Sequence, residues 1–345
     1  MASDRGAPVV DREVVTFRLT DPARRLAAVR LAQEVGLRGD LAFAWRAGTW
    51  ELAVPLPAVD RMEYLFEIVE HGRRKTITDP GNTRLAGGAF GQKSVVVFAG
   101  YREPAWLAWP GVAASSTSAS IGDIPCTIWT PEGLAAGEPA PLLLVHDGPE
   151  YASLGSFTTY LGALIAHGAI PPLRAALLAP VERNAWYSAN TDYADRLCAE
   201  LVPALDSVAP ATVRIGVGVS LGALALLHAH DRHPDTFGGL LLQSGSFFTP
   251  ELDPQEKEFS GFGAVTQFVA KIEDGSSRPV PTVMTCGGVE ENLANNQSMA
   301  KRLSRLGYSV DFVEVRDAHN YTAWRDALDP AFTDLLLSLG GNCAS

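Results

Sequence analysis

The chain of 345 residues has a hydrophobic content of 47% and a formal net charge of −11. This length predicts two domains, or one large domain with additions, and the hydrophobic content is ample for a sizeable core. The negative charge argues against a nucleic-acid-binding protein, because a phosphate-binding surface needs a basic field, and it gives no support for docking to an anionic membrane.

Neither a membrane anchor nor a metal site is predicted. No apolar run reaches the length of a membrane span, and the first residues lack the apolar segment of a signal peptide, so we expect a cytoplasmic protein. The four cysteines are scattered, without a C-x-x-C pair or the spacing of metal ligands. We therefore expect no metal and no cofactor, and no pattern indicates the oligomeric state.

Residues 1–100 are predicted to form a small antiparallel β-sandwich. Apolar residues alternate with polar ones along residues 50–56 and again along residues 61–68, and this period of two is typical of half-buried strands. Residues 23–35 are the one stretch that looks helical. A run rich in Ser, Ala and Thr lies near residue 115, so we expect a linker over residues 101–120.

Residues 121–345 have the pattern of an α/β domain. Short apolar segments alternate with helical ones, and the expected strands cover residues 142–145, 176–179, 213–217, 240–242, 283–285 and 312–315. Continuous apolar strands suit a mostly parallel sheet that is covered by helices on both faces.

The segment Gly218-Val219-Ser220-Leu221-Gly222 has the pattern Gly-x-Ser-x-Gly between an apolar strand and a helix of small, apolar residues. This arrangement predicts the nucleophile elbow of an α/β-hydrolase fold, with Ser220 as the nucleophile. Side chains at positions 218 and 222 would clash with the strand or the helix, which accounts for the glycines. The amide of Leu221, at the start of the helix, is predicted to face a developing oxyanion.

A nucleophilic serine needs a base, and the base needs an acid that orients it; in this fold the chain order is Ser, acid, His. The predicted base is His319, in the loop after the last predicted strand. The acid is expected in the loop after residues 283–285, where either Glu290 or Glu291 can serve; we favour Glu290 and rank Asp317 third. The histidines on or just after the elbow helix are predicted to be structural or solvated: His228, His230 and His233.

A second oxyanion donor is expected in the loop after residues 142–145, which reads His146-Asp147-Gly148-Pro149. Pro149 has no N–H, so Gly148 or a neighbour is the predicted donor, with a simple turn as the alternative. Arg183, after residues 176–179, is a candidate to bind a carboxylate or phenolate; a plain surface arginine is the alternative.

With these motifs the chain resembles the enterochelin (enterobactin) esterases. The resemblance rests on the elbow, on the Ser244-Gly245-Ser246 segment, and on residues 318–325, which are similar to a Gly-Gly-His-x-x-x-x-Trp-Arg signature. The Asp79-Pro80-x-Asn82 turn resembles the early-set, immunoglobulin-like domain of that family. The resemblance covers nearly the whole chain and implies an α/β-hydrolase domain preceded by a domain of this kind.

The resemblance implies a serine esterase that hydrolyses carboxylic esters through Ser220, His319 and Glu290, with the amides of Leu221 and Gly148 as oxyanion hole. It implies a small-molecule ester as substrate, with a siderophore as the candidate, and substrate contacts at Asp147, Arg183, Trp186 and Asn190. We expect the N-terminal domain to shape substrate access more than it supports chemistry. Two other functions stay open: a carbohydrate esterase of acetyl or feruloyl type, and a non-catalytic binding protein with a hydrolase fold.

Overall fold

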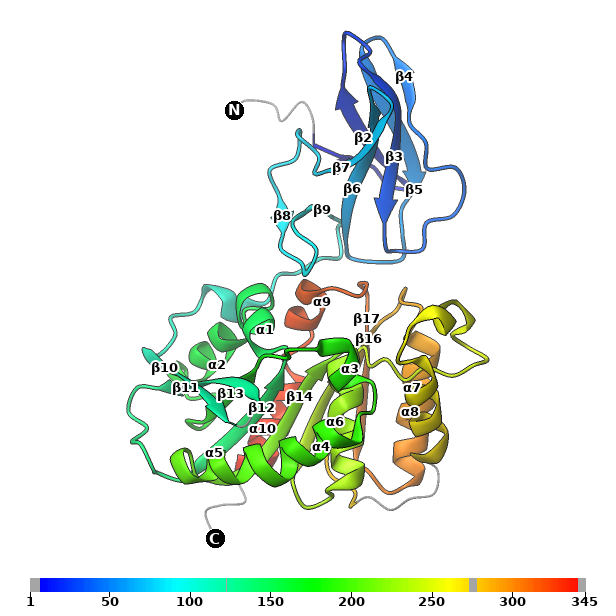
Figure 1. The fold of residues 1–345 in the computed structure, drawn as a ribbon. Helices are drawn as coiled ribbons and strands as arrows, with labels where there is room; N and C mark the ends of the chain where they lie inside the picture. The colour runs from blue at the N-terminus through cyan, green and yellow to red at the C-terminus, as the bar shows by residue number, and fades with distance from the viewer. Residues whose placement is uncertain (1–6, 122, 273–277, 341–345) are drawn as a thin grey trace. The chain divides into compact units, whose positions relative to one another are not determined.

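A computed structural model describes residues 7–121, 123–272 and 278–340 of the chain (Figure 1). The chain divides into two compact units. The smaller unit comprises Met1–Arg102 together with two later segments, Gly287–Glu290 and Arg316–Ala323, and the larger unit comprises the rest. Two loops that follow strands of the larger unit therefore pack as parts of the smaller one.

The N-terminal part of the smaller unit consists of two antiparallel sheets, which we call the two-sheet domain. One sheet has the strand order β1-β2-β5-β4, and the other has the order β3-β6-β9-β8 with β7 paired to β6. The strands are β1 (Val9–Val10), β2 (Val14–Thr20), β3 (Leu26–Gln33), β4 (Ala44–Arg46), β5 (Thr49–Pro55), β6 (Arg61–Glu70), β7 (Arg73–Ile77), β8 (Leu85–Ala86) and β9 (Lys93–Val97).

Alternating apolar residues build the core of the two-sheet domain. Phe17 on β2 and Leu52 on β5 come from one sheet, whereas Leu31 on β3 and Phe66 on β6 come from the other, and all four belong to one buried cluster. The side chains point inward at every second position because strands alternate faces. Both sheets therefore share one core, and an immunoglobulin-like topology remains a prediction.

The stretch expected to be helical, residues 23–35, instead contains strand β3, Leu26–Gln33. Val29 and Leu31 are buried whereas Ala27 and Arg30 are exposed, so the true period is two. Antiparallel pairing with β6 from Leu26 to Gln33 overrides the helix-favouring composition.

The larger unit contains an eight-stranded sheet with the order β10-β11-β13-β12-β14-β15-β16-β17. Strands β13, β12, β14, β15 and β16 pair in parallel, and β10 and β11 form an antiparallel end. The strands are β10 (Ala114–Ile121), β11 (Ile124–Pro131), β12 (Ala140–His146), β13 (Arg174–Leu178), β14 (Ala211–Val219), β15 (Gly239–Gln243), β16 (Thr282–Gly287) and β17 (Val310–Val315). Residues 114–121, expected to be part of a linker, form the edge strand β10.

Helices cover both faces of this sheet, as predicted. A Cβ atom at Gly216 would meet Leu226 of α6, whereas one at Gly239 would meet Leu339 and Leu335 of α10. Figure 1 shows α6 and α10 on opposite faces. The helices are α1 (Gly148–Leu154), α2 (Phe157–Ala166), α3 (Arg183–Tyr187), α4 (Thr191–Arg196), α5 (Val202–Val208), α6 (Leu221–Arg232), α7 (Phe262–Lys271), α8 (Leu293–Arg305), α9 (Tyr321–Asp326) and α10 (Ala331–Gly340).

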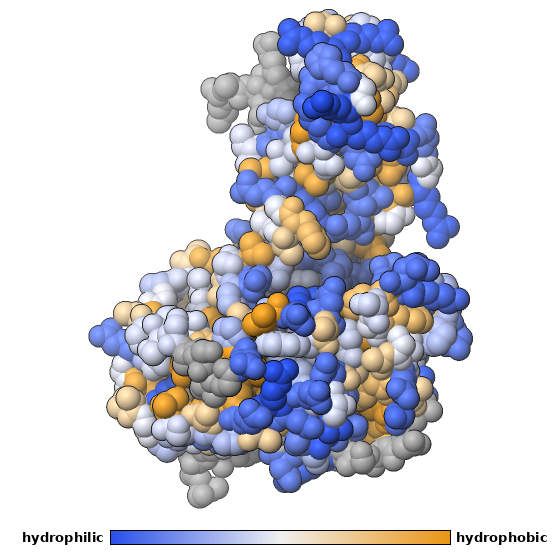
Figure 2. Space-filling model, in the orientation of Figure 1, coloured by the Kyte–Doolittle hydropathy of each residue, from blue (hydrophilic) through white to orange (hydrophobic). Residues whose placement is uncertain are grey.

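Hydrophilic and hydrophobic residues are interspersed over the visible face of each unit (Figure 2). Within the described ranges, no helix is long and apolar enough to cross a membrane. No group of three or more His, Cys, Asp and Glu side chains in those ranges is arranged to hold a metal ion.

Candidate active site

Ser220 occupies the sharp turn between β14 and α6. Its backbone has φ 55° and ψ −125°, a conformation that residues other than glycine rarely adopt and that costs about 1–3 kcal/mol. Strain of this kind at a strand-to-helix turn is what a nucleophile elbow requires. Leu221 is the first residue of α6, where the helix dipole favours negative charge.

Close backbone approach accounts for the two glycines of the elbow. A Cβ atom at Gly218 would lie 2.6 Å from the carbonyl carbon of Gly222, and one at Gly222 would lie 3.0 Å from Cβ of His146. Packing thus requires a glycine at position 218, as the sequence predicts, whereas a Cβ atom at position 222 would make a tight contact. The second contact also brings the start of α6 against the loop that follows β12.

Ser246 is a neighbour of Ser220 to which no role is assigned from the sequence. Its Oγ lies 3.3 Å from Oγ of Ser220, and its N–H donates to the Ser220 carbonyl at 3.2 Å. Ser246 lies in the loop after β15, the strand next to β14. Its position in Ser244-Gly245-Ser246 just after that strand is the signal that could have identified it.

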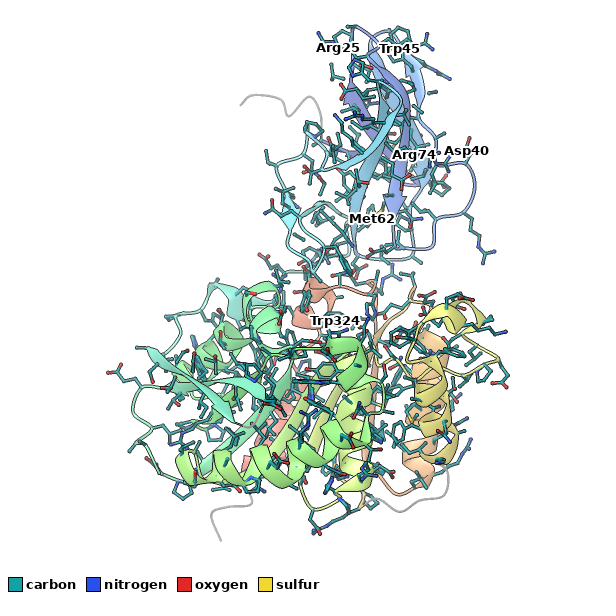
Figure 3. All side chains as sticks on the ribbon, viewed as in Figure 1. Arg25, Asp40, Trp45, Met62, Arg74 and Trp324 are labelled. Carbon is teal, nitrogen blue, oxygen red and sulfur yellow. The ribbon has the colours of Figure 1, made fainter. Side chains whose placement is uncertain are left out.

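The strand end behind Ser220 is held by Gln243 and Trp324. The Gln243 carbonyl accepts the Ser220 N–H at 2.9 Å, and the Gln243 side chain donates to the Trp324 carbonyl at 3.0 Å and accepts from Tyr151. Trp324, labelled in Figure 3, donates from Nε1 to Oγ of Ser244 at 2.9 Å. These buried contacts fix the elbow against the neighbouring strand.

The loop after β12 carries Asp147 and Gly148, and the role of Gly148 as second oxyanion donor stays a prediction. Asp147 has φ 51° and precedes α1, of which Gly148 is the first residue. The Asp147 carboxylate accepts three hydrogen bonds from Arg183, two from Nε at 2.8 and 3.0 Å and one from an Nη atom at 2.7 Å. The structure thus brings together two of the residues that the resemblance assigns to substrate contact, and they bind each other.

Tyr187 and Tyr193 form hydrogen bonds with Asp147 and His146 of the loop after β12. Tyr187 accepts the Asp147 N–H at 3.3 Å, and the Tyr193 hydroxyl lies 2.7 Å from Nε2 of His146. His146 is fully buried, and burial, with a smaller contribution from Arg183, lowers its pKa from 6.5 to about 3. His146 is therefore neutral at physiological pH, and sequence reasoning missed this group because its members lie far apart in the chain.

Trp186 and Asn190 take part in packing and capping. Trp186 is buried and stacks on Tyr193, with ring centroids 5.3 Å apart. Asn190 caps α4 by accepting the Tyr193 N–H at 2.9 Å, and it donates to the Ala185 carbonyl at 3.2 Å. Their contact with a substrate stays a prediction.

His319 and Glu290 meet in the smaller unit. Nδ1 of His319 lies 2.8 Å from Oε2 of Glu290, and Oε1 of Glu290 accepts the Gly287 N–H at 2.8 Å. Glu291 is exposed and accepts from Gln255 at 3.3 Å. Asp317 is paired with Arg61 at 3.0 Å. Among the three acids considered from the sequence, Glu290 is the one for which a hydrogen bond to His319 is seen, whereas Ser220 belongs to the larger unit.

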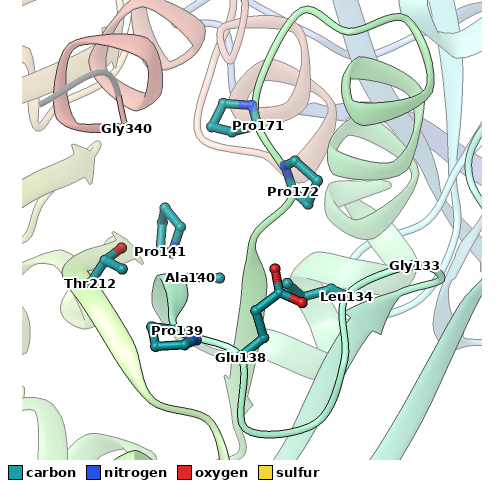
Figure 4. Close-up of a pocket in the computed structure, with 10 residues that line it drawn as sticks. All are labelled: Gly133, Leu134, Glu138, Pro139, Ala140, Pro141, Pro171, Pro172, Thr212 and Gly340. Carbon is teal, nitrogen blue, oxygen red and sulfur yellow. The ribbon is translucent and has the colours of Figure 1, made fainter. Parts of the chain in front are cut away.

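A pocket of about 200 Å³ lies elsewhere in the larger unit (Figure 4). Its lining includes Ala140 at the start of β12, Pro172 just before β13, and Thr212 near the start of β14. Ser220 follows the carboxyl end of β14, whereas this pocket lies at the amino ends of the strands. Ligands of open α/β sheets bind at the carboxyl ends of the strands, and the pocket therefore carries no argument for function.

The strand-elbow-helix arrangement and the α/β sheet define a member of a hydrolase-fold class, and sequence comparison names the family. The family described as "Putative esterase" matches residues 118–335. The chain belongs to this esterase family.

Curated relatives of the chain are iron(III) enterobactin esterases. The protein from Escherichia coli (strain K12) is 26% identical over 211 residues, which cover 59% of this chain and 51% of that protein. The protein from Dickeya dadantii (strain 3937) is 28% identical over 228 residues, which cover 61% and 51%. The chain thus spans about half the length of the curated relatives it matches. These relatives confirm the predicted resemblance to enterochelin esterases.

Solved structures with the same fold include two enterobactin esterases. The ferric enterobactin esterase from Salmonella typhimurium superposes with a TM-score of 0.79 at 20% identity, covering 96% of each chain. The Shigella flexneri enzyme, solved in the presence of enterobactin, gives a TM-score of 0.76 at 20% identity and covers 97% of this chain and 95% of that one. At this identity the likeness shows the fold.

Proposed function

We propose that the protein is a serine esterase that hydrolyses carboxylic esters with Ser220 as nucleophile, His319 as base and Glu290 as the orienting acid. The strained elbow conformation of Ser220 is the observation that carries the proposal. The hydrogen bond between His319 and Glu290 supports it, because a catalytic imidazole needs an acid at Nδ1 to hold the working tautomer.

In the proposed reaction, Oγ of Ser220 attacks the ester carbonyl carbon while Nε2 of His319 accepts the hydroxyl proton. The tetrahedral intermediate collapses, the bond to the alcohol oxygen breaks, and His319 returns the proton to the leaving alcohol. Water then attacks the acyl-serine with the same proton transfers and releases the carboxylic acid. Glu290 stabilises the imidazolium that forms in both steps.

The amides of Leu221 and Gly148 are proposed to stabilise the oxyanion. Leu221 begins the twelve-residue helix α6 directly after the nucleophile. Gly148 lies in the loop that the Arg183–Asp147 ion pair and Tyr187 hold in place. Fixed donors of this kind are effective because they need no reorganisation as charge develops on the carbonyl oxygen.

For the substrate we propose an ester of the enterobactin type, a catechol-serine lactone or its linear esters, with any bound iron as cargo of the substrate. Membership of the esterase family and the enterobactin-esterase relatives support this choice. Neither a sugar-ester substrate nor a purely binding role is favoured by a feature of the site.

A panel of purified esters tests the function. The wild-type protein is expected to hydrolyse cyclic and linear catechol-serine esters with a higher kcat/KM than acetylated xylan or feruloyl esters, and to hydrolyse nitrophenyl esters. Hydrolysis of none of these by wild-type protein would refute the esterase function. Preference for xylan or feruloyl esters would replace the substrate class.

A further inference from the structure

Arg61 connects the two-sheet domain to the loop that carries His319. It begins strand β6, one residue before Met62 (labelled in Figure 3), and its side chain is only 2% exposed. One Nη atom donates to Asp317 at 3.0 Å and to Asn320 at 2.8 Å. Asp317 lies two residues before His319 and Asn320 lies one residue after it. The Arg61 guanidinium therefore binds the loop on both sides of His319 in the sequence.

The other arm of Arg61 is anchored within its own strand. Its second Nη atom donates to Glu63 at 2.6 Å, and Glu63 is also buried. Lys93 lies 3.9 Å from the second oxygen of Glu63. Burial alone would lower the pKa of Arg61, but the charges of Asp317 and Glu63 raise it above its usual value. Arg61 therefore stays charged, and its planar fork bridges β6 and the loop.

The two partners of Arg61 in the loop, Asp317 and Asn320, also organise the loop backbone. Oδ1 of Asp317 accepts the Ala318 N–H at 2.7 Å and the Asn320 side-chain amide at 3.1 Å. Oδ1 of Asn320 accepts the Ala323 N–H at 2.9 Å as well as the Arg61 hydrogen bond. Loss of Arg61 would thus release the groups that shape the backbone on each side of His319.

Further contacts place this loop, and the loop that carries Glu290, against the two-sheet domain. The Asp60 N–H donates to the Arg316 carbonyl at 2.8 Å, and the Asp60 carboxylate accepts a hydrogen bond from Nε of Arg316 at 2.9 Å. Ala318 is 2% exposed and belongs to the core of the two-sheet domain, and Val289, next to Glu290, packs on that core. These contacts tie the two-sheet domain to the loop of His319, and the expectation that this domain shapes substrate access more than it supports chemistry stays a prediction.

We propose that Arg61 is a positioning residue for His319, through which the two-sheet domain sets the orientation of the base. This inference rests on the function proposed above for His319. Arg61 touches no reacting atom; it acts through Asp317 and Asn320. A positioning role differs from a merely structural one because it links Arg61 to the His319–Glu290 hydrogen bond as well as to stability.

The test compares Arg61→Gln and Arg61→Lys with Asp21→Asn in the full chain. Asp21 is a matched control, because it is a buried polar residue of the same domain that accepts from Arg25, Leu26 and Trp50 at 2.8–3.0 Å, away from the loop. The readouts are kcat and KM on nitrophenyl acetate and the low-field NMR resonance of the His319 Nδ1 proton. All are measured at a temperature where each variant is folded.

Arg61→Gln is expected to lower kcat about a hundredfold with KM changed less than about twofold, and to remove the Nδ1 resonance. Arg61→Lys keeps the charge but cannot bridge three partners, and we expect a loss of about tenfold in kcat. Asp21→Asn is expected to lower the thermal midpoint while keeping kcat and the resonance. If Arg61→Gln does not fold, Arg61→Lys decides.

Wild-type kcat and an unchanged resonance in Arg61→Gln, or in Arg61→Lys where only that variant folds, would overturn the proposal. Equal losses in Asp21→Asn would overturn it as well, because they would show a general effect of domain stability. Failure of the proposed function shows elsewhere: His319→Ala would then retain wild-type turnover, whereas the resonance would still report whether Arg61 orients His319.

Discussion

Glu290 binds His319 through one carboxylate oxygen, at 2.8 Å from Nδ1, and binds the Gly287 N–H through the other, also at 2.8 Å. The Glu290 side chain is 1% exposed, whereas that of His319 is 36% exposed. A buried carboxylate held at both oxygens cannot turn away from the imidazole without losing a hydrogen bond. This geometry suits an acid that orients a base.

Glu290→Gln is expected to lower kcat about ten-thousandfold, because a neutral amide neither holds the working tautomer nor stabilises the imidazolium. The matched variant Glu291→Gln should keep kcat within about threefold, since the exposed Glu291 contacts Gln255 instead. Steady-state kinetics on one nitrophenyl ester measures both. The reverse ranking would assign the acid to Glu291, and no effect of either would point to Asp317.

Arg183→Gln is expected to lower kcat on a small neutral ester by about ten- to a hundredfold, because the buried Asp147 loses its cation and the Gly148 loop is released. A neutral ester offers no carboxylate or phenolate to an arginine. Unchanged turnover of that ester, with loss confined to anionic esters, would show that Arg183 acts on the substrate instead. Arg232→Gln, which removes an exposed ion pair with Asp195, is the control and should be neutral.

Gly218→Ala is expected to lower the free energy of unfolding by about 1–3 kcal/mol and to abolish most turnover, because its Cβ would lie 2.6 Å from the Gly222 backbone. Gly263→Ala in α7 is the control. Apart from its chain neighbours and the backbone of its own helix, no atom lies within 4 Å of a Cβ atom at that position, so the change should be neutral or stabilising by up to about 1 kcal/mol. Urea unfolding of both variants checks the contrast, and an equally stable Gly218→Ala would contradict the packing argument.

His146 is expected to make the protein sensitive to acid. Its pKa is about 3 in the folded chain and 6.5 as the usual value, so the folded state binds fewer protons than the unfolded state between these values. The stabilisation is complete above about pH 6.5 and is lost as pH falls toward 3, by up to about 1.4 kcal/mol per pH unit. Urea unfolding at several pH values from 7 to 4.5 gives the free energy of unfolding at each pH. This free energy should fall less steeply with decreasing pH in His146→Gln than in the wild type. An equal dependence on pH would contradict the lowered pKa of His146.

The sequence predicts the features of the larger unit that depend on local patterns. The apolar segments expected at residues 142–145, 213–217 and 240–242 lie within β12, β14 and β15, because strands buried on both faces are apolar throughout. The elbow can also be predicted from the sequence, because a side chain at position 218 would clash with the backbone only four residues further on, at Gly222.

The remaining features depend on contacts that no local pattern records. Arg61 binds Asp317, which lies 256 residues away in the sequence. The carboxylate of Asp147 binds Arg183 across strands β12 and β13, which pair in parallel. The backbone of a single loop decides between Glu290 and its neighbour Glu291. Strand β10 could not be predicted, because its small polar residues resemble those of a linker. An edge strand tolerates such residues because only one side of it pairs.

Mass-spectrometric mapping of a fluorophosphonate adduct tests most directly whether Ser220 is the nucleophile. Such a reagent bonds to a serine activated by its base. We expect one adduct, on the tryptic peptide of residues 215–232 and at Ser220, and none in Ser220→Ala. An adduct on another residue, or a wild-type protein that remains unlabelled while folded, would contradict the account.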